Sequence, residues 1–351
     1  MMEKKKILFL YTELARYFLA SVGQLLASGR VEVHIVRWAV NKEAPFRFQF
    51  DPRIHIYDRD QYDGKALAAL AEQIDPDAIV CSGWIDRDYV KICQARKKKS
   101  VTIITLDNKW RGSFRQQVAR IISPFTLKRI FHYAWVPGKL QQQYAGKLGF
   151  SMQQVRTGFY SADTDFFSKQ YAENQLQKAA RFPHRFLYVG RYYEFKGLAE
   201  LWEAFVQLKA EDENDWELWC LGTGDMKPVE HPAIRHFGFV QPEDLGQYLA
   251  GTGVFVMPSR VEPWGVVLHE FAAAGFPLLC SNNVGAVSQF VREGENGFIF
   301  SAGNTGSIKK VLRKIISCSD EELNRMGKQS AAKALEITPQ TWAGTLLGMI
   351  G

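Results

Sequence analysis

Two glutamates flank the beginning of a predicted helix in the second half of the chain. Glu262 lies in the loop after a short apolar run, and Glu270 follows eight residues later, just over one turn into the helix. The amides of Gly265, Val266 and Val267 lie between them, and the first amides of a helix have no acceptor inside it. Carboxylates accept hydrogen bonds from sugar hydroxyls, and such amides donate to phosphate oxygens. The stretch therefore predicts a site for a nucleotide-sugar.

Two cations follow another predicted strand, residues 186–189. Arg191 stands at the end of that strand, and Lys196 lies just before a predicted helix. Cations and helix N-termini both stabilise phosphate charge, so this pair would suit a pyrophosphate. The alternative is that both are surface cations of an ordinary loop.

Paired glycines end the next predicted strand, Glu217–Leu221. Gly222 and Gly224 allow a tight turn and a close approach of the backbone to a ligand. Their spacing differs from the dinucleotide fingerprint, which has a third glycine and an acid some twenty residues later. The alternative here is a strand-to-loop turn without a ligand.

The first half of the chain carries a basic stripe. Residues 96–147 contain twelve lysines and arginines and a single acid, Asp107, which follows a predicted strand at residues 101–106. Such a stripe attracts anionic lipid headgroups, a phosphate-bearing acceptor or nucleic acid, unless its cations only solvate helix faces. Asp107 is a candidate acceptor-binding or catalytic residue, and the alternatives are a helix N-cap or a structural ion pair.

Residues 113–131 combine apolar and basic side chains at helical spacing, and Pro124 is expected to break them into two pieces. A basic amphipathic helix can lie on an anionic membrane. The alternative is that its apolar face packs in the core.

Short apolar runs alternate with helical patterns along all 351 residues, which predicts parallel sheets wrapped by helices. The pattern restarts after a polar stretch, so we expect two doubly wound domains with a boundary near residue 160. A composition of 46% hydrophobic and 23% charged residues excludes disordered and low-complexity chains. Such domains bind ligands beyond the carboxyl ends of their strands.

Metal sites, disulfides and membrane spans are not expected from this sequence. The five cysteines include no CxxC pair, the seven histidines form no HxxxH pair, and no apolar run is long enough to cross a bilayer. A reducing cytoplasm fits best. The D-x-D triplets at Asp58/Asp60, Asp86/Asp88 and Asp163/Asp165 lack a strand context that would suggest a metal.

Four motifs in register resemble the retaining glycosyltransferases of family 4, which have the GT-B fold. They are LYVGRYYEFKG, CLGTGD, the E-x7-E motif EPWGVVLHE with its AAAGFP tail, and REGENGFIF. They span roughly residues 185–300, whereas the N-terminal half resembles the family only in its strand–helix pattern. The resemblance implies an α/β protein of two facing Rossmann-like domains with a cleft between them.

The resemblance also implies roles for the site residues. Glu270 would bind the ribose hydroxyls, and Glu262 would lie beside the hydroxyls of the donor sugar. Arg191 and Lys196 would bind the diphosphate and stabilise its charge as the glycosidic bond breaks. The amides that open the helix would add to the phosphate site, and no metal or other cofactor would be needed.

One loop departs from the family pattern. Many members have a Gly-Gly loop after the first strand, where the donor phosphates approach, and residues 12–15 here contain no glycine. Thr12 is the candidate donor contact in this loop. Glu13 would place a carboxylate near the diphosphate unless it points to the acceptor.

These observations predict a cytoplasmic, retaining, metal-independent hexosyltransferase that uses a UDP-sugar, with a GDP-sugar as second choice. Residues 1–160 would bind the acceptor, residues 161–337 the donor, and a helix at 338–351 would cross back to the first domain. The acceptor would be a surface glycan or a lipid-linked saccharide, with peripheral contact to an anionic inner membrane and no nucleic acid. The alternatives are an epimerase or hydrolase with Asp107 or Glu13 as general base, a non-catalytic basic binding protein, and an inactive family member.

Overall fold

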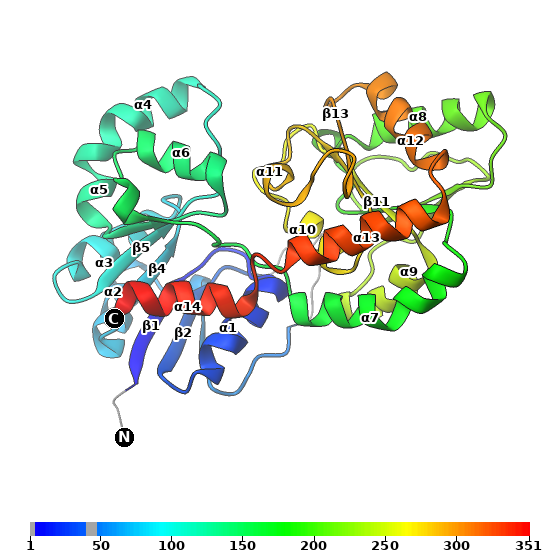
Figure 1. The fold of residues 1–351 in the computed structure, drawn as a ribbon. Helices are drawn as coiled ribbons and strands as arrows, with labels where there is room; N and C mark the ends of the chain where they lie inside the picture. The colour runs from blue at the N-terminus through cyan, green and yellow to red at the C-terminus, as the bar shows by residue number, and fades with distance from the viewer. Residues whose placement is uncertain (1–3, 40–47) are drawn as a thin grey trace. The chain divides into compact units, whose positions relative to one another are not determined.

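The computed structural model describes residues 4–39 and 48–351, and they form two compact units. Unit 1 comprises Met1–Ser161 together with Ile337–Gly351, and unit 2 comprises Ala162–Glu336. Each unit is a parallel sheet covered by helices, as the alternating sequence pattern predicts (Figure 1).

The sheet of unit 1 has the strand order β3-β2-β1-β4-β5-β6-β7, and every described strand pair is parallel. Its strands are β1 (Lys5–Leu10), β2 (Val31–Arg37), β3 (Ile54–Asp58), β4 (Ala78–Ser82), β5 (Val101–Thr105), β6 (Tyr133–Trp135) and β7 (Val155–Arg156). Its helices are α1 (Arg16–Ala27), α2 (Gly64–Ile74), α3 (Arg87–Arg96), α4 (Phe114–Ile122), α5 (Leu127–Ile130), α6 (Lys139–Lys147) and α14 (Pro339–Ile350).

Side chains of β1 alternate between two cores, one on each face of this sheet. Ile7 and Phe9 belong to the core that also contains residues of α1 and α14, whereas Leu8 and Leu10 belong to the core under α2, α3 and α6. The helix α14 packs along α1 (Figure 1), and its Trp342 donates a hydrogen bond of 2.7 Å to the carbonyl of Phe159. Burial on both faces explains why these strands read as continuous apolar runs.

The sheet of unit 2 has the order β10-β9-β8-β11-β12-β13, again with parallel pairs throughout its described strands. Its strands are β8 (Arg185–Val189), β9 (Glu217–Leu221), β10 (Ile234–His236), β11 (Val254–Met257), β12 (Leu278–Ser281) and β13 (Gly297–Phe300). Its helices are α7 (Thr164–Ala180), α8 (Leu198–Glu211), α9 (Gly246–Gly251), α10 (Val266–Ala273), α11 (Val287–Phe290), α12 (Thr305–Ile316) and α13 (Asp320–Ala334).

Candidate functional site

The loop after β8 carries both predicted cations. Arg191 follows the end of the strand, and Lys196 ends a short 3₁₀ turn that leads into α8. Gly197 joins that turn to the helix with a φ of +71°, and a Cβ on it would lie 2.2 Å from the carbonyl oxygen of Pro258. Only glycine fits this position, because the left-handed backbone and the close contact both exclude a side chain. The loop after β8 is thus pressed against the end of β11.

Lys196 and Glu262 form an ion pair between these two loops. The Nζ of Lys196 lies 2.5 Å from Oε2 of Glu262, and the two side chains are 20% and 14% exposed. The carbonyl of Phe195 accepts hydrogen bonds from the amides of Arg260 and Val261 at 2.9 and 3.2 Å. A cation and a carboxylate that are 66 residues apart are therefore held together at one place.

The loop that carries Glu262 is also fixed by the loop after β12. The carbonyl of Glu262 accepts from the amide of Gly285 at 3.1 Å, and the carbonyl of Trp264 accepts from the amide of Ala286 at 2.9 Å. The ring of Trp264 is fully buried and meets Phe290 edge-on, with ring centres 6.2 Å apart. This support holds the Glu262 carboxylate in a defined position.

The helix α10 begins at the expected place. Gly265 is its N-cap with a φ of +91°, and a Cβ there would lie 2.7 Å from the terminal carbon of Met257. The amides of Val266 and Val267 are the first two of the helix, where donors have no acceptor within the helix. Glu270 is half-buried and lies one turn beyond Val266 on the same side of the helix. Amide donors at the start of the helix and a carboxylate therefore lie within one turn of each other along α10.

Gly222 and Gly224 allow the backbone of their loop to lie close to other atoms. In the structure those atoms belong to the loop after β8. A Cβ on Gly222 would lie 1.9 Å from the carbonyl oxygen of Gly190, and one on Gly224 would lie 2.5 Å from that of Tyr192. The amide of Tyr192 donates to the carbonyl of Thr223 at 2.8 Å. The glycines let the loop after β9 brace the loop that carries Arg191, and a direct contact with a ligand stays a prediction.

These loops meet at the point where the strand order of unit 2 reverses. β8 and β11 are neighbours in the sheet, β9 lies on the other side of β8, and β12 lies on the other side of β11. The chain leaves the carboxyl ends of β8 and β11 in opposite directions. In doubly wound sheets, ligands bind in the crevice at such a point. Arg191, Lys196, Glu262 and the amides that open α10 all follow these two strands. The arrangement offers cations and amides to an anion, and carboxylates to hydroxyl groups.

Asp107 and Thr12 lie at the carboxyl ends of strands in unit 1. Asp107 follows β5, and its Oδ2 accepts a hydrogen bond of 3.4 Å from the hydroxyl of Tyr160. Burial, and secondly the Asp107 charge, raise the pKa of Tyr160, so that phenol stays a donor. Thr12 follows β1, and its carbonyl accepts from the amide of Trp38 at 2.9 Å. β1 and β5 are separated by β4, which corresponds to about 10 Å between strands.

The N-cap alternative for Asp107 is wrong. The next helix, α4, begins at Phe114, and its N-cap is Ser113, whose side chain accepts from the amide of Gln116. The carboxylate of Asp107 is oriented instead by Tyr160 and by the side-chain amide of Asn108, which donates to Oδ1 at 3.3 Å.

One supporting ion pair was not predicted from the sequence. Glu200 on α8 is buried, and its Oε1 accepts a hydrogen bond of 2.5 Å from Nε of Arg260. Arg260 stands two residues before Glu262, so this pair fixes the start of the loop that carries the carboxylate. The partners are 60 residues apart, and no local pattern marks them.

The helix α4 exposes its apolar face. It is described along its whole length and has no buried residue, so core packing is wrong for this helix. It holds for part of residues 113–131, because Leu127 on α5 belongs to the core and Ile130 packs against it. Phe114, Ile121 and Phe125 are 83%, 70% and 67% exposed. As predicted, the helical segment is interrupted at Pro124, where a 3₁₀ turn separates α4 from α5. The exposed basic residues of this surface are Arg115, Arg120, Lys128 and Arg129. None of the helices in the described ranges has the length and apolar content needed to span a membrane.

Part of unit 2 is similar to a family of known proteins. Residues 173–333 match the family model described as "Glycosyl transferases group 1". The lipopolysaccharide core biosynthesis glycosyltransferase LpsE of Rhizobium meliloti is 30% identical over 136 residues, which cover 37% of this chain and 38% of that protein. The phosphatidyl-myo-inositol mannosyltransferase of Mycobacterium leprae is 31% identical over 146 residues, or 39% and 38% of the two chains. The alignments span less than half the length of these curated relatives.

Solved structures match the whole chain. Sucrose-phosphate synthase of Thermosynechococcus elongatus aligns with a TM-score of 0.70 and 17% identity over 99% of this chain and 98% of that one. HepE of Anabaena, in complex with UDP and glucose, aligns with a TM-score of 0.70 and 13% identity over 99% of each chain. The chain has the GT-B fold. At these identities the likeness establishes the fold alone, and the GT-B prediction of two Rossmann-like domains is confirmed.

Proposed function

We propose that this GT-B protein is a retaining glycosyltransferase that moves a sugar from a nucleotide-sugar to an acceptor hydroxyl. One observation carries the proposal: Lys196 and Glu262 meet at the β8/β11 reversal, beside the helix start that supplies the amides of Val266 and Val267. This group lies inside the segment that matches the glycosyltransferase family. It combines the donors that a diphosphate needs with a carboxylate that a sugar hydroxyl needs.

In this proposal the leaving diphosphate is stabilised by charge. Arg191 and Lys196 bind its oxygens together with the amides that open α10, and their attraction grows as negative charge develops on the leaving group. Glu262 orients the ammonium of Lys196 in the free protein and accepts a hydroxyl of the donor sugar in the complex. Glu270, one turn along α10, accepts the ribose hydroxyls. The residues supply the positive charge themselves, so we expect the transfer to need no metal.

A UDP-sugar is the proposed donor, with a GDP-sugar as the alternative. Support comes from the structural relative HepE, which was solved with UDP-glucose, with a TM-score of 0.69 over 98% of this chain. Unit 1 is the proposed acceptor domain, where Asp107 and Tyr160 would contact the reacting hydroxyl group. The acceptor class proposed is a surface glycan or a lipid-linked saccharide.

We also propose that α4 and the following turn dock on an anionic membrane at the cytoplasmic face. The segment from α4 to α5 exposes both apolar side chains and cations, which is what an interfacial helix requires. A variant that combines Phe114→Ala, Ile121→Ala and Phe125→Ala should bind at least tenfold more weakly to vesicles that contain phosphatidylglycerol, because each large apolar side chain contributes about 1.5–3 kcal/mol when buried. Leu176→Ala is the matched control, since Leu176 is 80% exposed on α7 in unit 2. Equal loss in the control, or none in the variant, would contradict membrane docking.

Product analysis tests the enzymatic proposal. The protein is incubated with UDP-sugars and GDP-sugars, with and without a lipid-linked saccharide fraction, and the nucleotide, free sugar and lipid products are quantified. Transfer to lipid that keeps the anomeric configuration and persists in EDTA supports the proposal. Free sugar as the sole product would indicate a hydrolase, an altered sugar on the nucleotide would indicate an epimerase, and no turnover of any donor would indicate an inactive relative.

A further inference from the structure

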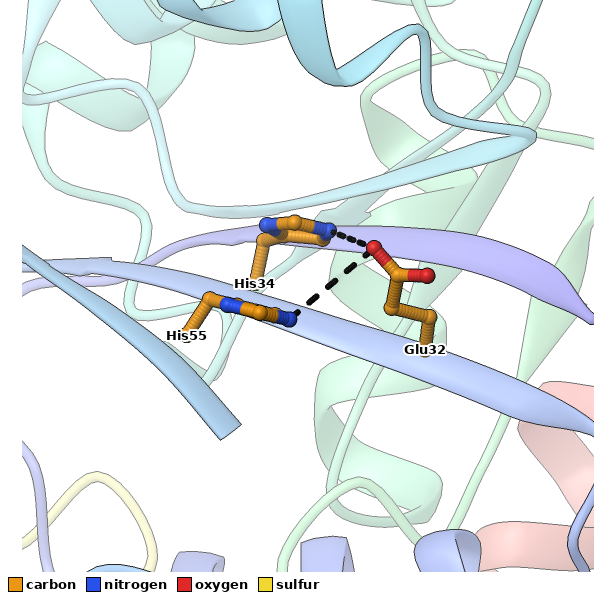
Figure 2. A group of neighbouring side chains, drawn as sticks. All are labelled: Glu32, His34 and His55. Carbon is orange, nitrogen blue, oxygen red and sulfur yellow. Dashed lines mark hydrogen bonds and ion pairs between the residues drawn. The ribbon is translucent and has the colours of Figure 1, made fainter. Parts of the chain in front are cut away.

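Three potential metal ligands lie together on the sheet of unit 1. Glu32 and His34 belong to β2, and His55 belongs to the edge strand β3 (Figure 2). His34 and His55 are direct partners in the parallel register, and Glu32 precedes His34 by two residues. Side chains two residues apart on a strand point to the same face, so all three project from one side of the sheet.

The ligand atoms are already close to coordinating distances. Oε1 of Glu32 lies 2.8 Å from Nε2 of His34 and 4.0 Å from Nε2 of His55 (Figure 2), and each residue of the group places a ligand atom within 4.8 Å of the others. A tetrahedral zinc ion, with bonds of about 2.0–2.2 Å, holds its ligand atoms roughly 3.4 Å apart. The side chains of Glu32 and His55 are 37% and 53% exposed, so small rotations can close the remaining difference.

The other nitrogen of His34 has the partner that a metal ligand requires. Nδ1 of His34 lies 3.2 Å from the hydroxyl of Tyr57 on β3. With a metal on Nε2, the ring proton is on Nδ1 and is donated to that hydroxyl oxygen, which fixes the tautomer and the ring plane. The rings of His34 and His55 stack with centres 4.6 Å apart, which limits their freedom further.

A positive charge that would oppose metal binding is carried by the neighbouring strand β1. Lys6 is in register with Glu32, and its Nζ donates to the carbonyl of Ile74 at 3.2 Å. The amine is thus held at the end of α2, which leaves the Glu32 carboxylate to the two imidazoles. Its charge lowers the affinity for a cation without occupying the ligand positions.

We propose that Glu32, His34 and His55 bind one divalent transition-metal ion that ties the edge strand β3 to β2. Two imidazoles and a carboxylate select zinc, copper(II) or nickel(II) over magnesium and calcium, which prefer oxygen ligands. The fourth position is open to water. The site belongs to unit 1, whereas the loops after β8 and β11 belong to unit 2, and we give it no part in the proposed sugar transfer.

Calorimetric titration of the EDTA-treated full chain with zinc chloride tests this site, and cobalt(II) absorption reports the coordination geometry. We expect one ion per chain and a tetrahedral cobalt spectrum. His55→Ala and Glu32→Gln should weaken binding by at least tenfold, and Tyr57→Phe should weaken it by about tenfold through the tautomer of His34. His34 is mostly buried, so its substitution is not used to decide.

Two control variants separate this site from adventitious binding. The five cysteines all lie within the described residues, and Cys318 is the only partly exposed one among them. His231 is a partly exposed histidine of unit 2. Cys318→Ser and His231→Ala should leave the stoichiometry and affinity unchanged. Zinc binding that survives in His55→Ala and Glu32→Gln, or that is lost in Cys318→Ser, would overturn the proposal. Magnesium should not compete for the site.

Discussion

Replacing Gly197 with alanine is expected to separate the loops that carry Lys196 and Glu262. The φ of +71° costs an ordinary residue about 1–2 kcal/mol. The new Cβ would lie 2.2 Å from the carbonyl oxygen of Pro258, and an ordinary contact is at least 1 Å longer, so the backbone must also shift. We therefore expect Gly197→Ala to lower the free energy of unfolding by about 2–4 kcal/mol. The shift should also move the ammonium of Lys196 and weaken nucleotide binding.

Urea unfolding and calorimetric titration with UDP measure the two effects separately. Gly23→Ala is the matched control, because Gly23 lies within α1 and its new Cβ would have no atom within 4 Å apart from its chain neighbours and the backbone of its own helix. That change should raise stability by about 0.5–1 kcal/mol, since alanine is the better helix former. A Gly197→Ala protein as stable as the wild type would refute the close contact of the two loops. Lower stability with unchanged nucleotide affinity would refute the link between this contact and the site.

Three further predictions concern single side chains. Lys196→Ala should lower kcat on the order of 10²-fold or more with a smaller change in donor KM, because its charge matters most as the diphosphate leaves; an unchanged kcat in steady-state assays would contradict this. Glu270→Ala should raise the donor KM and weaken nucleotide binding by about 1.5–3 kcal/mol through loss of charge-assisted hydrogen bonds, which calorimetry can measure. Burial lowers the pKa of Lys178 to about 7 from its ordinary value of 10.5, with the ammonium over the ring of Phe276. Between pH 7 and 10.5 the unfolded chain holds a proton on Lys178 that the folded chain lacks. The free energy of unfolding should therefore rise with pH by up to about 1.4 kcal/mol per pH unit. Lys178→Met should remove this slope, which urea unfolding at pH 7 and 9 measures.

Central strands were predictable because burial on both faces makes them continuous apolar runs. β1, β4, β8 and β11 all fall on runs that the sequence displays. β7 (Val155–Arg156) and β10 (Ile234–His236) were not predicted, because they are short edge strands that contain polar residues. Hydrogen bonds to β6 and β9 hold these two segments in the sheets, and their side-chain pattern does not indicate a strand.

In the candidate site, features set by neighbouring residues were predictable from the sequence, whereas contacts between distant residues were not. The spacing from Glu262 to Glu270 is set by one loop and one helical turn, so the sequence indicates it directly. The support of Arg260 by Glu200 joins positions 60 residues apart and has no local signature. The group of Glu32, His34 and His55 was likewise missed, because a search for HxxxH spacing tests one helix, whereas strand register assembles these ligands.

The central claim is that the loops after β8 and β11 bind a nucleoside diphosphate, and calorimetric titration of UDP and GDP tests it most directly. Each nucleotide is titrated with and without EDTA into the wild type, Lys196→Ala and Glu270→Ala. We predict that one nucleotide binds the wild type with one site per chain, that EDTA leaves its affinity unchanged, and that both variants bind it at least tenfold more weakly. Binding that both variants retain at full strength, or a wild type that binds neither nucleotide, would contradict the account.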